Sequence, residues 1–242
     1  MSSLWLSVVL GLVAGLADYL GGFLLVRRSP SARALRYFVA LGAGFMLSAA
    51  VVEMVPEGMR VNPHWAPLLI LVGYCGVHLL EHTLVPHFHF GEETHRHEFI
   101  SAKTSYSVLL GLATHTFFDG VAIGSGFVLS SWLGWVLFFA VFLHKFPEGF
   151  TMASVMLAGG RSKAAALNSA LFLGAMTVMG VLAISLKPGW VRLGLPLSAG
   201  VTLYVAATDL VPEVNREPGI RMALVFFIGV AVFFLLRLAA PF

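Results

Sequence analysis

The strongest constraint in this sequence is a series of long apolar segments, each at least the roughly 20 residues that a helix needs to cross a bilayer. Eight such segments occur, at residues 4–26, 34–59, 66–86, 104–129, 131–158, 162–186, 190–214 and 219–239. The chain of 242 residues is 58% hydrophobic and 11% charged, whereas soluble domains are about 45–50% apolar and about 25% charged. The sequence therefore predicts an all-α integral membrane protein, a single polytopic domain over residues 1–242 that lies in a lipid bilayer.

The distribution of lysine and arginine predicts the orientation of these spans. Loops one, three, five and seven and their flanks carry ten of these residues, and the opposite side carries four. Cytoplasmic loops are the richer in basic residues, so we expect the odd-numbered loops in the cytoplasm and both termini outside, most simply at the plasma membrane. The basic residues lie at loop ends rather than along a stripe, so the formal net charge of +3 does not indicate nucleic-acid binding.

Two of the apolar segments carry the same pattern of glycine, acid and Pro-Glu. In each of the segments 34–59 and 190–214, these four residues are separated by the same numbers of positions. They are Gly44, Glu53, Pro56 and Glu57 in the first segment and Gly200, Asp209, Pro212 and Glu213 in the second. These segments are an odd number of spans apart, so they cross the membrane in opposite senses. The pattern predicts an inverted repeat, which is typical of transporters that work by alternating access.

Two histidine–carboxylate pairs lie inside consecutive apolar segments. Segment 104–129 contains His115 and Asp119, and segment 131–158 contains His144 and Glu148. Residues four apart share one face of a helix, and the short turn at Ser130 makes the two helices antiparallel neighbours. Ionisable groups within a membrane span are costly and indicate function by default. We expect two imidazoles and two carboxylates to converge near the middle of the membrane.

This donor set predicts the kind of ion. Imidazole nitrogens with carboxylate oxygens suit zinc, with cadmium, iron, manganese and cobalt as relatives, and neither Cu(I) nor Ca²⁺ and Mg²⁺ match it. One such pair alone would more simply hold two helices together by a hydrogen bond, but two matched pairs favour a metal site. Pro147 lacks an N–H and is expected to open the helix beside these ligands.

At these motifs the sequence resembles the ZIP (Zrt/Irt-like) family of divalent metal transporters. The residues that carry the resemblance form two motifs, His115-x-x-x-Asp119-Gly120-x-Ala122-Ile123-Gly124 and His144-x-x-Pro147-Glu148-Gly149, on a background of eight spans. The resemblance implies a 3+2+3 arrangement, in which helices 1–3 and 6–8 are related by inversion around two central helices. It also implies transport rather than catalysis, with zinc uptake toward the cytoplasm through a site on helices 4 and 5. An intramembrane metal-dependent enzyme using the same ligands is the alternative, and a structural protein is a second one.

The family resemblance also draws attention to Lys145, Met46 and Glu53. Many ZIP proteins place a ligand for a second metal where this chain has Lys145, and an ammonium group has no lone pair to donate. We therefore expect a single metal. Met46 and Glu53 lie where relatives contribute a further ligand or line the entrance path, although Glu53 is equally expected to pair with Asp209 or Lys145.

The third loop, residues 87–103, is rich in histidine and acidic residues, a composition able to hold metal loosely. Its candidate ligands are His87, His89, His95 and His97. The resemblance places this tract on the cytoplasmic side, where it would catch exiting ions, but a solvated polar loop has the same composition.

Several other residues have weaker interpretations. His78 and His82 lie one helical turn apart, and packing or a hydrogen bond explains them better than metal binding. Gly11-x-x-x-Gly15 is a spacing that brings helices together in membranes, so a homodimer through the first span is an option. Asp18 has no evident partner in the sequence, and we assign it no role.

Overall fold

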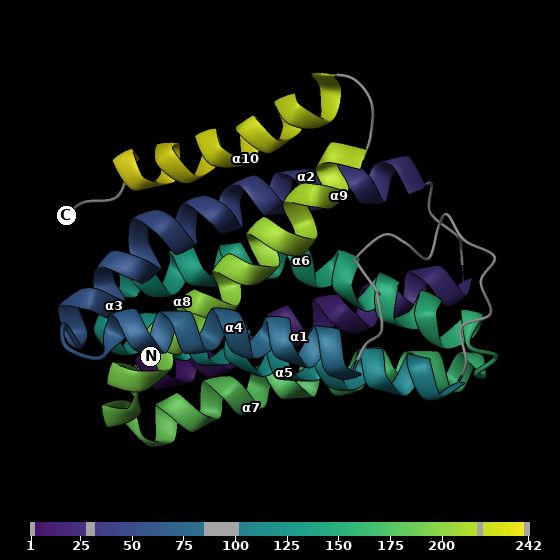
Figure 1. Cartoon of the computed structure of the whole chain (residues 1–242), viewed down its shortest axis with the longest axis horizontal. Coiled ribbons are helices and arrows are strands. Elements are labelled where there is room, and N and C mark those ends of the chain that lie inside the picture. The colour runs from purple at the N-terminus through teal and green to yellow at the C-terminus, as the bar shows by residue number, and fades with distance from the viewer. Residues whose placement is uncertain (1–2, 28–31, 85–101, 217–219, 240–242) are drawn as a thin grey trace.

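The computed structural model describes residues 3–27, 32–84, 102–216 and 220–239, and it shows a bundle of long helices lying roughly parallel and antiparallel (Figure 1). Six spans are single helices: α1 (Ser3–Arg27), α4 (Ala66–Leu84), α5 (Ala102–Leu129), α6 (Ser131–Ala158), α7 (Lys163–Leu186) and α10 (Ile220–Ala239). The second span consists of α2 (Ala32–Ala49), a π-helical segment (Ala50–Met54) and α3 (Val55–Val61). The seventh consists of a 3₁₀ turn (Pro188–Trp190), α8 (Val191–Tyr204), a π-helical segment (Val205–Leu210) and α9 (Val211–Arg216).

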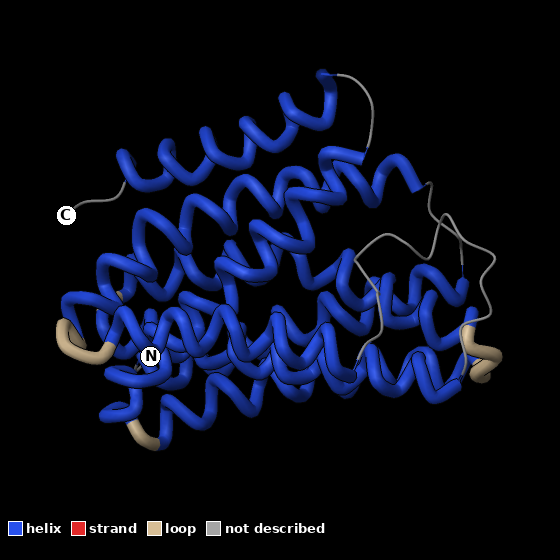
Figure 2. Tube along the Cα trace, in the orientation of Figure 1, coloured by secondary structure: helices blue, strands red, loops and turns tan. Residues whose placement is uncertain are grey.

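All eight helical stretches are long and apolar enough to cross a membrane. No strand occurs among the residues that the structure describes (Figure 2). Large apolar side chains remain open on the outside of the bundle, with Leu238 78%, Leu186 74% and Ile220 71% exposed. Such a surface is stable only in a lipid environment. The predicted all-helical, eight-span fold class is confirmed.

The helices pack in two groups of four rather than as two separate triplets. Helices α1, α5, α6 and α7 pack on one another, and α2, α4, α8 and α10 make up the second group. The groups meet where α2 packs against α6 and α8 packs against α5. Of the eight spans, α6 is the most deeply buried, whereas α4 and α10 are the least buried.

The two halves of the chain make equivalent contacts. Helix α1 packs on α6 as α7 packs on α5, and α2 packs on α10 as α8 packs on α4. A Cβ on Gly44 would overlap the carbonyl oxygen of Phe226, and a Cβ on Gly200 would overlap that of Ile70. A π-helical segment follows each of these glycines within its repeat. The repeat seen in the sequence is thus also a repeat of backbone contacts.

The helix stays regular at Pro147, where we expected it to open. Helix α6 runs from Ser131 to Ala158 without interruption, although Pro147 lies inside it. The proline ring removes one backbone donor, but the helical backbone continues past it. The irregular turns are instead the π-helical segments of the second and seventh spans, which contain Glu53 and Asp209.

The glycines of the first span serve packing within the chain. A Cβ on Gly15 would lie 2.6 Å from the carbonyl oxygen of Gly174, and one on Gly11 would lie 2.8 Å from a methyl carbon of Val181. Both partners belong to α7, and both glycines are buried. The prediction that these glycines offer a dimer contact is therefore wrong, because the face that carries them is already covered by α7.

The contact between α4 and α8 generates the first testable prediction. A Cβ on Gly73 would overlap the carbonyl oxygen of Leu197, whereas a Cβ on Gly76 of the same helix meets nothing within 4 Å. Gly73→Ala should lower the free energy of unfolding in detergent by about 1–3 kcal/mol, the usual cost of overpacking. The matched control Gly76→Ala should leave it unchanged or raise it by up to about 1 kcal/mol, because alanine favours a helix. Equal unfolding free energies for the two variants would contradict the packing described.

Candidate metal site

The four predicted ligands converge in the interior of the bundle, between α5 and α6. One ligand atom from each of His115, Asp119, His144 and Glu148 lies within 4.8 Å of the other three, and all four residues are buried. They form the one group of this kind among the described parts of the chain. The positions follow from the i, i+4 spacing on each helix and from the tight turn between the helices.

Ser130 produces that turn. It lies between α5 and α6 in extended backbone, and its Oγ accepts a hydrogen bond from the backbone N–H of Leu133 at 3.1 Å. Such an N-cap contributes about 1 kcal/mol, and here it begins α6 directly after α5 ends. The two ligand-bearing helices therefore pack side by side.

The spacing of the ligand atoms matches a four-coordinate site. The Nε2 of His115 lies 3.4 Å from the Nε2 of His144 and 3.1 Å from Oδ2 of Asp119. The Nε2 of His144 lies 3.2 Å from the same Asp119 oxygen and 3.9 Å from Oε2 of Glu148. Ligands of a tetrahedral zinc ion at about 2.0–2.1 Å are roughly 3.3 Å apart. The two imidazole nitrogens and the Asp119 oxygen have this spacing, and Oε2 of Glu148 lies somewhat farther from the imidazole of His144.

One hydrogen bond orients an imidazole of the site. The Nδ1–H of His144 donates to the carbonyl oxygen of Ala140 at 2.9 Å. A carbonyl oxygen only accepts, so the proton lies on Nδ1, and Nε2 presents its lone pair to the cluster. This outer hydrogen bond is the usual way in which a protein holds a metal-binding histidine in the correct tautomer.

The ammonium group of Lys145 lies at the same cluster and is fully buried. Its Nζ is 2.8 Å from Oδ2 of Asp119 and 2.5 Å from Oε2 of Glu148. The Oγ1 of Thr116 accepts a further hydrogen bond from it at 3.2 Å. Lys145 thus places a positive charge directly on the two carboxylates of the site.

Thr116 joins the lysine and the glutamate. Its hydroxyl accepts from Lys145 and donates to Oε1 of Glu148. Sequence analysis missed this residue because a threonine in an apolar helix carries no motif. The sequence feature that could have identified it is its position directly after His115. When the motifs that begin at His115 and His144 are aligned, Thr116 corresponds to Lys145.

Sequence analysis also missed Asp18 of α1. This carboxyl group is fully buried, and its Oδ2 lies 3.9 Å from Nζ of Lys145. The site therefore includes a third carboxylate from a helix outside the central pair. No spacing within the sequence connects Asp18 to the motifs of α5 and α6.

The secondary candidates lie elsewhere. Met46 is buried in an apolar cluster with Tyr204 and Val205, and Glu53 forms an ion pair with Arg237 of α10 at 3.0 Å. The structure brings neither of them to the four ligands. The loop candidates His87, His89, His95 and His97 lie outside the described residues.

The histidines of α4 are held by local contacts. The Nδ1–H of His82 donates to the carbonyl oxygen of His78 at 2.9 Å, and the two rings are 4.1 Å apart. Tyr204 donates a hydrogen bond to Glu81 of the same helix at 2.8 Å. The prediction that His78 and His82 pack and hydrogen-bond is confirmed.

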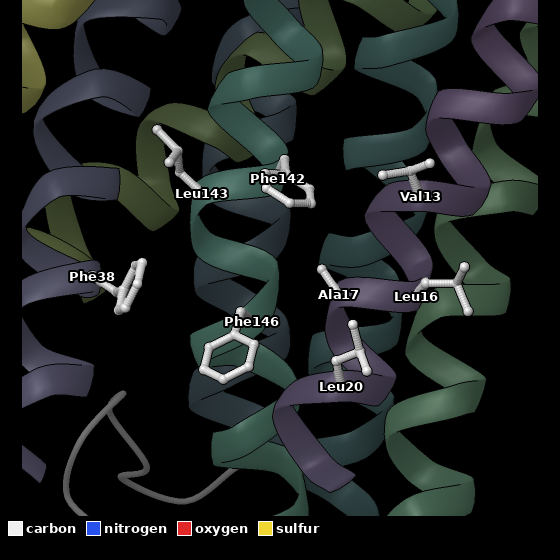
Figure 3. A pocket seen from close by; sticks show the side chains of 8 residues that line it. All are labelled: Val13, Leu16, Ala17, Leu20, Phe38, Phe142, Leu143 and Phe146. Carbon is white, nitrogen blue, oxygen red and sulfur yellow. The ribbon is translucent and has the colours of Figure 1, made fainter. Parts of the chain in front are cut away.

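An apolar groove of about 470 Å³ lies between α1, α2 and α6 (Figure 3). It is lined by Val13, Leu16, Ala17, Leu20, Phe38, Phe142, Leu143 and Phe146. Ala17 precedes Asp18, and Phe146 follows Lys145. Apolar neighbours thus face the groove, while the buried charges of the next residues face the interior.

Comparison with known proteins adds to this geometry. The family model described as "ZIP Zinc transporter" matches residues 89–237, which include both ligand motifs. The chain belongs to the ZIP family. Its ligand cluster therefore lies in the part of the chain that matches the family, whereas Asp18 lies before that part.

Individual relatives have moderate identity to this ZIP chain. Zinc transporter ZIP5 of Mus musculus is 33% identical over 183 residues, which are 73% of this chain and 31% of the relative. Zinc transporter ZIP4 of Homo sapiens is 32% identical over 132 residues, 51% of this chain and 20% of the relative. Zinc transporter ZupT of Enterobacter sp. (strain 638) is 28% identical over 123 residues, 48% of each. The chain thus spans less than half the length of these curated relatives.

The hydroxyl of Thr116 gives a prediction about the stability of the site. Thr116→Val keeps the shape of the side chain but removes its hydrogen bonds to Lys145 and Glu148, so the free energy of unfolding should fall by about 1–3 kcal/mol. The matched control is Thr114→Val on the same helix, because the Thr114 hydroxyl bonds only the carbonyl of Leu110 near the surface. The control should change the free energy by less than about 0.5 kcal/mol. Denaturation in detergent measures both, and an equal response would show that Thr116 adds nothing to the cluster.

Proposed function

We propose that this chain transports a divalent transition-metal ion, zinc before cadmium, iron, manganese or cobalt, through the site on α5 and α6. The observation that carries the proposal is the convergence of two imidazole nitrogens and two carboxylate oxygens, all within 4.8 Å of one another, in the interior of the bundle. Membership of the ZIP family and the names of the relatives as zinc transporters support the same conclusion. The ion is the substrate, held by His115, Asp119, His144 and Glu148 during its passage.

Alternating access is the mechanism that the fold favours. The two halves of the chain make equivalent contacts in opposite orientation, as in carriers that expose one central site to each side in turn. The ligands lie where these halves meet, on the pair of helices that the repeat surrounds. The ion binds from one side, and the site then opens to the other when the two groups of helices shift.

We further propose uptake toward the cytoplasm. The excess of basic residues in the odd-numbered loops supports an orientation with those loops inside and both termini outside. The histidine-rich tract at residues 87–103 then lies on the side to which the ion leaves, where it captures exiting metal. The plasma membrane is the location that this orientation fits most simply.

One metal at a time is the expected stoichiometry. The ammonium of Lys145 contacts Asp119 and Glu148 at 2.8 and 2.5 Å. A second dication next to the first would occupy the same oxygens, and like charges repel strongly at such distances. The lysine therefore takes the place of a second metal and shares the carboxylates with a single one.

An intramembrane metalloenzyme with the same ligands is the rival function. The His-Glu-x-x-His motif of one large class of metalloproteases is absent from the sequence. No observation in the structure favours catalysis over transport. An assay of metal flux separates the two, because the enzyme moves no metal across the membrane.

The central prediction concerns zinc flux into proteoliposomes. His144→Ala and Glu148→Gln should reduce the initial rate of uptake to that of protein-free vesicles, because the first removes a nitrogen ligand of the transported ion and the second replaces a charged carboxylate ligand with a neutral amide. His64→Ala is the control, since this exposed histidine lies outside the cluster and its loss should leave the rate unchanged. Wild-type rates in folded His144→Ala or Glu148→Gln protein would discard the assignment of the site.

The single-metal proposal is tested by stoichiometry in a chain whose loop histidines, residues 87, 89, 95 and 97, are alanine. Metal analysis of the purified protein after removal of free zinc should give one zinc per chain. Adding Lys145→Asn, which replaces the ammonium with an amide oxygen donor, should give two. Two tightly bound zinc ions in the chain that keeps Lys145 would refute the proposal.

A further inference from the structure

The carboxyl group of Asp18 is buried without a hydrogen-bond partner. Neither of its oxygens makes a hydrogen bond to any described residue, and its side chain is fully shielded from solvent. A buried carboxylate without a partner is costly, so a group of this kind calls for an explanation such as a functional role. The nearest positive charge is the ammonium of Lys145, whose Nζ is 3.9 Å from Oδ2 of Asp18.

The backbone keeps Asp18 beside this lysine. A Cβ on Gly149 would overlap the carbonyl oxygen of Asp18, so α1 and α6 are in backbone contact at this point. Gly149 directly follows Glu148, and Lys145 lies one turn earlier on the same helix. The carboxylate therefore stays close to the ammonium, separated from it by a gap that a small rotation of a lysine side chain closes.

The repeat provides an internal comparison. A Cβ on Gly120 would overlap the carbonyl oxygen of Thr177, as one on Gly149 overlaps that of Asp18. Thr177 of α7 is thus the counterpart of Asp18, and like Asp18 it is fully buried with no hydrogen-bond partner for its side chain among the described residues. The counterpart of Lys145 is Thr116. At the contact of α6 with α1 an ammonium and a carboxylate occupy these two positions, and at the contact of α5 with α7 two threonines occupy the equivalent positions.

The formal charges of a loaded site balance when Asp18 is included as a carboxylate. With all three carboxyl groups ionised, Asp18, Asp119 and Glu148 supply three negative charges, and Lys145 supplies one positive charge. One divalent ion on neutral imidazoles brings the total to zero. Without Asp18 the loaded site would carry one uncompensated positive charge in a low-dielectric interior, which is strongly unfavourable.

The contacts of Asp119 show why the lysine has to move when a metal binds. The Oδ2 of Asp119 lies 3.1 and 3.2 Å from the two imidazole nitrogens and 2.8 Å from Nζ of Lys145. A metal bound by both imidazoles therefore takes the oxygen that the ammonium now holds. The two cations repel, and Asp18, which is not one of the four ligands, has an oxygen 3.9 Å from the ammonium, within reach of a displaced lysine side chain.

We propose that Asp18 is a positioning residue of the transport site, which receives the Lys145 ammonium when a divalent metal takes Asp119 and Glu148. The metal ion then replaces the Lys145 ammonium as the partner of the Asp119 and Glu148 carboxylates. The ammonium rests on Asp119 and Glu148 while the site is empty and on Asp18 while the site is loaded. This inference rests on the proposed function for the identity of the ligand, and it adds the residue that makes room for that ligand.

A double-mutant cycle on zinc binding to the purified chain in detergent tests the proposal. Asp18→Asn should raise the dissociation constant for zinc roughly tenfold, because the ammonium then stays on Asp119 and Glu148 and competes with the metal. In a Lys145→Met background no ammonium competes, so Asp18→Asn should have a much smaller effect. An equal change in both backgrounds means that Asp18 acts through its charge alone, and it overturns the proposal.

Thr177→Val is the matched control for the cycle. It removes a buried side-chain oxygen at the equivalent position of the other half, and it should leave the dissociation constant unchanged. A tenfold loss of affinity in this variant would show that any change at either helix contact disturbs the site, and would contradict a specific role for Asp18.

The zinc-bound wild-type structure provides a test that needs no variant, in case Asp18→Asn does not fold. The Nζ of Lys145 should lie within about 3 Å of an Asp18 oxygen and should have left Oδ2 of Asp119. An ammonium that stays on Asp119 and Glu148 with zinc bound overturns the proposal.

The tests of Asp18 are independent of the test of zinc transport. A chain that binds zinc but carries none into vesicles refutes the proposed function, whereas zinc flux without coupling between Asp18 and Lys145 refutes only this inference.

Discussion

The compensation of buried charge between Lys145 and the carboxylates around it is the interaction on which this structure depends. A lysine and three acidic residues within membrane spans are each costly alone, and they are tolerated because they meet at one point. Hydroxyl and imidazole groups complete the cluster with specific hydrogen bonds. The same arrangement that makes these charges tolerable also creates an attractive site for a divalent cation.

The close approach of helices makes this meeting of charges feasible. Gly149 and Gly120 bring α6 and α5 into backbone contact with α1 and α7, so that side chains from three helices reach the same small volume. The two halves of the chain use the same contacts in opposite orientation. The side chains at these equivalent contacts differ. Lys145 and Asp18 lie at one contact, and Thr116 and Thr177 occupy the equivalent positions at the other.

The sequence predicted the parts that depend on local periodicity. Eight apolar segments and two pairs at i, i+4 follow directly from helix geometry, and so does the convergence of His115 and Asp119 with His144 and Glu148. Asp18 and Thr116 were missed because their roles depend on which helices touch, and no spacing within one helix encodes that. The glycines Gly11 and Gly15 correctly indicated a close helix contact, but the partner is α7 of the same chain rather than a second copy. The π-helical turns were missed because one extra residue in a turn leaves an apolar pattern almost unchanged.

The most direct test of the central claim is anomalous diffraction at the zinc edge from crystals of the chain soaked in zinc. The account predicts one strong peak, about 2.0–2.2 Å from Nε2 of His115, Nε2 of His144 and one oxygen each of Asp119 and Glu148. The absence of a peak at these four atoms would contradict it. So would a second peak of equal strength at the position that the ammonium of Lys145 now occupies.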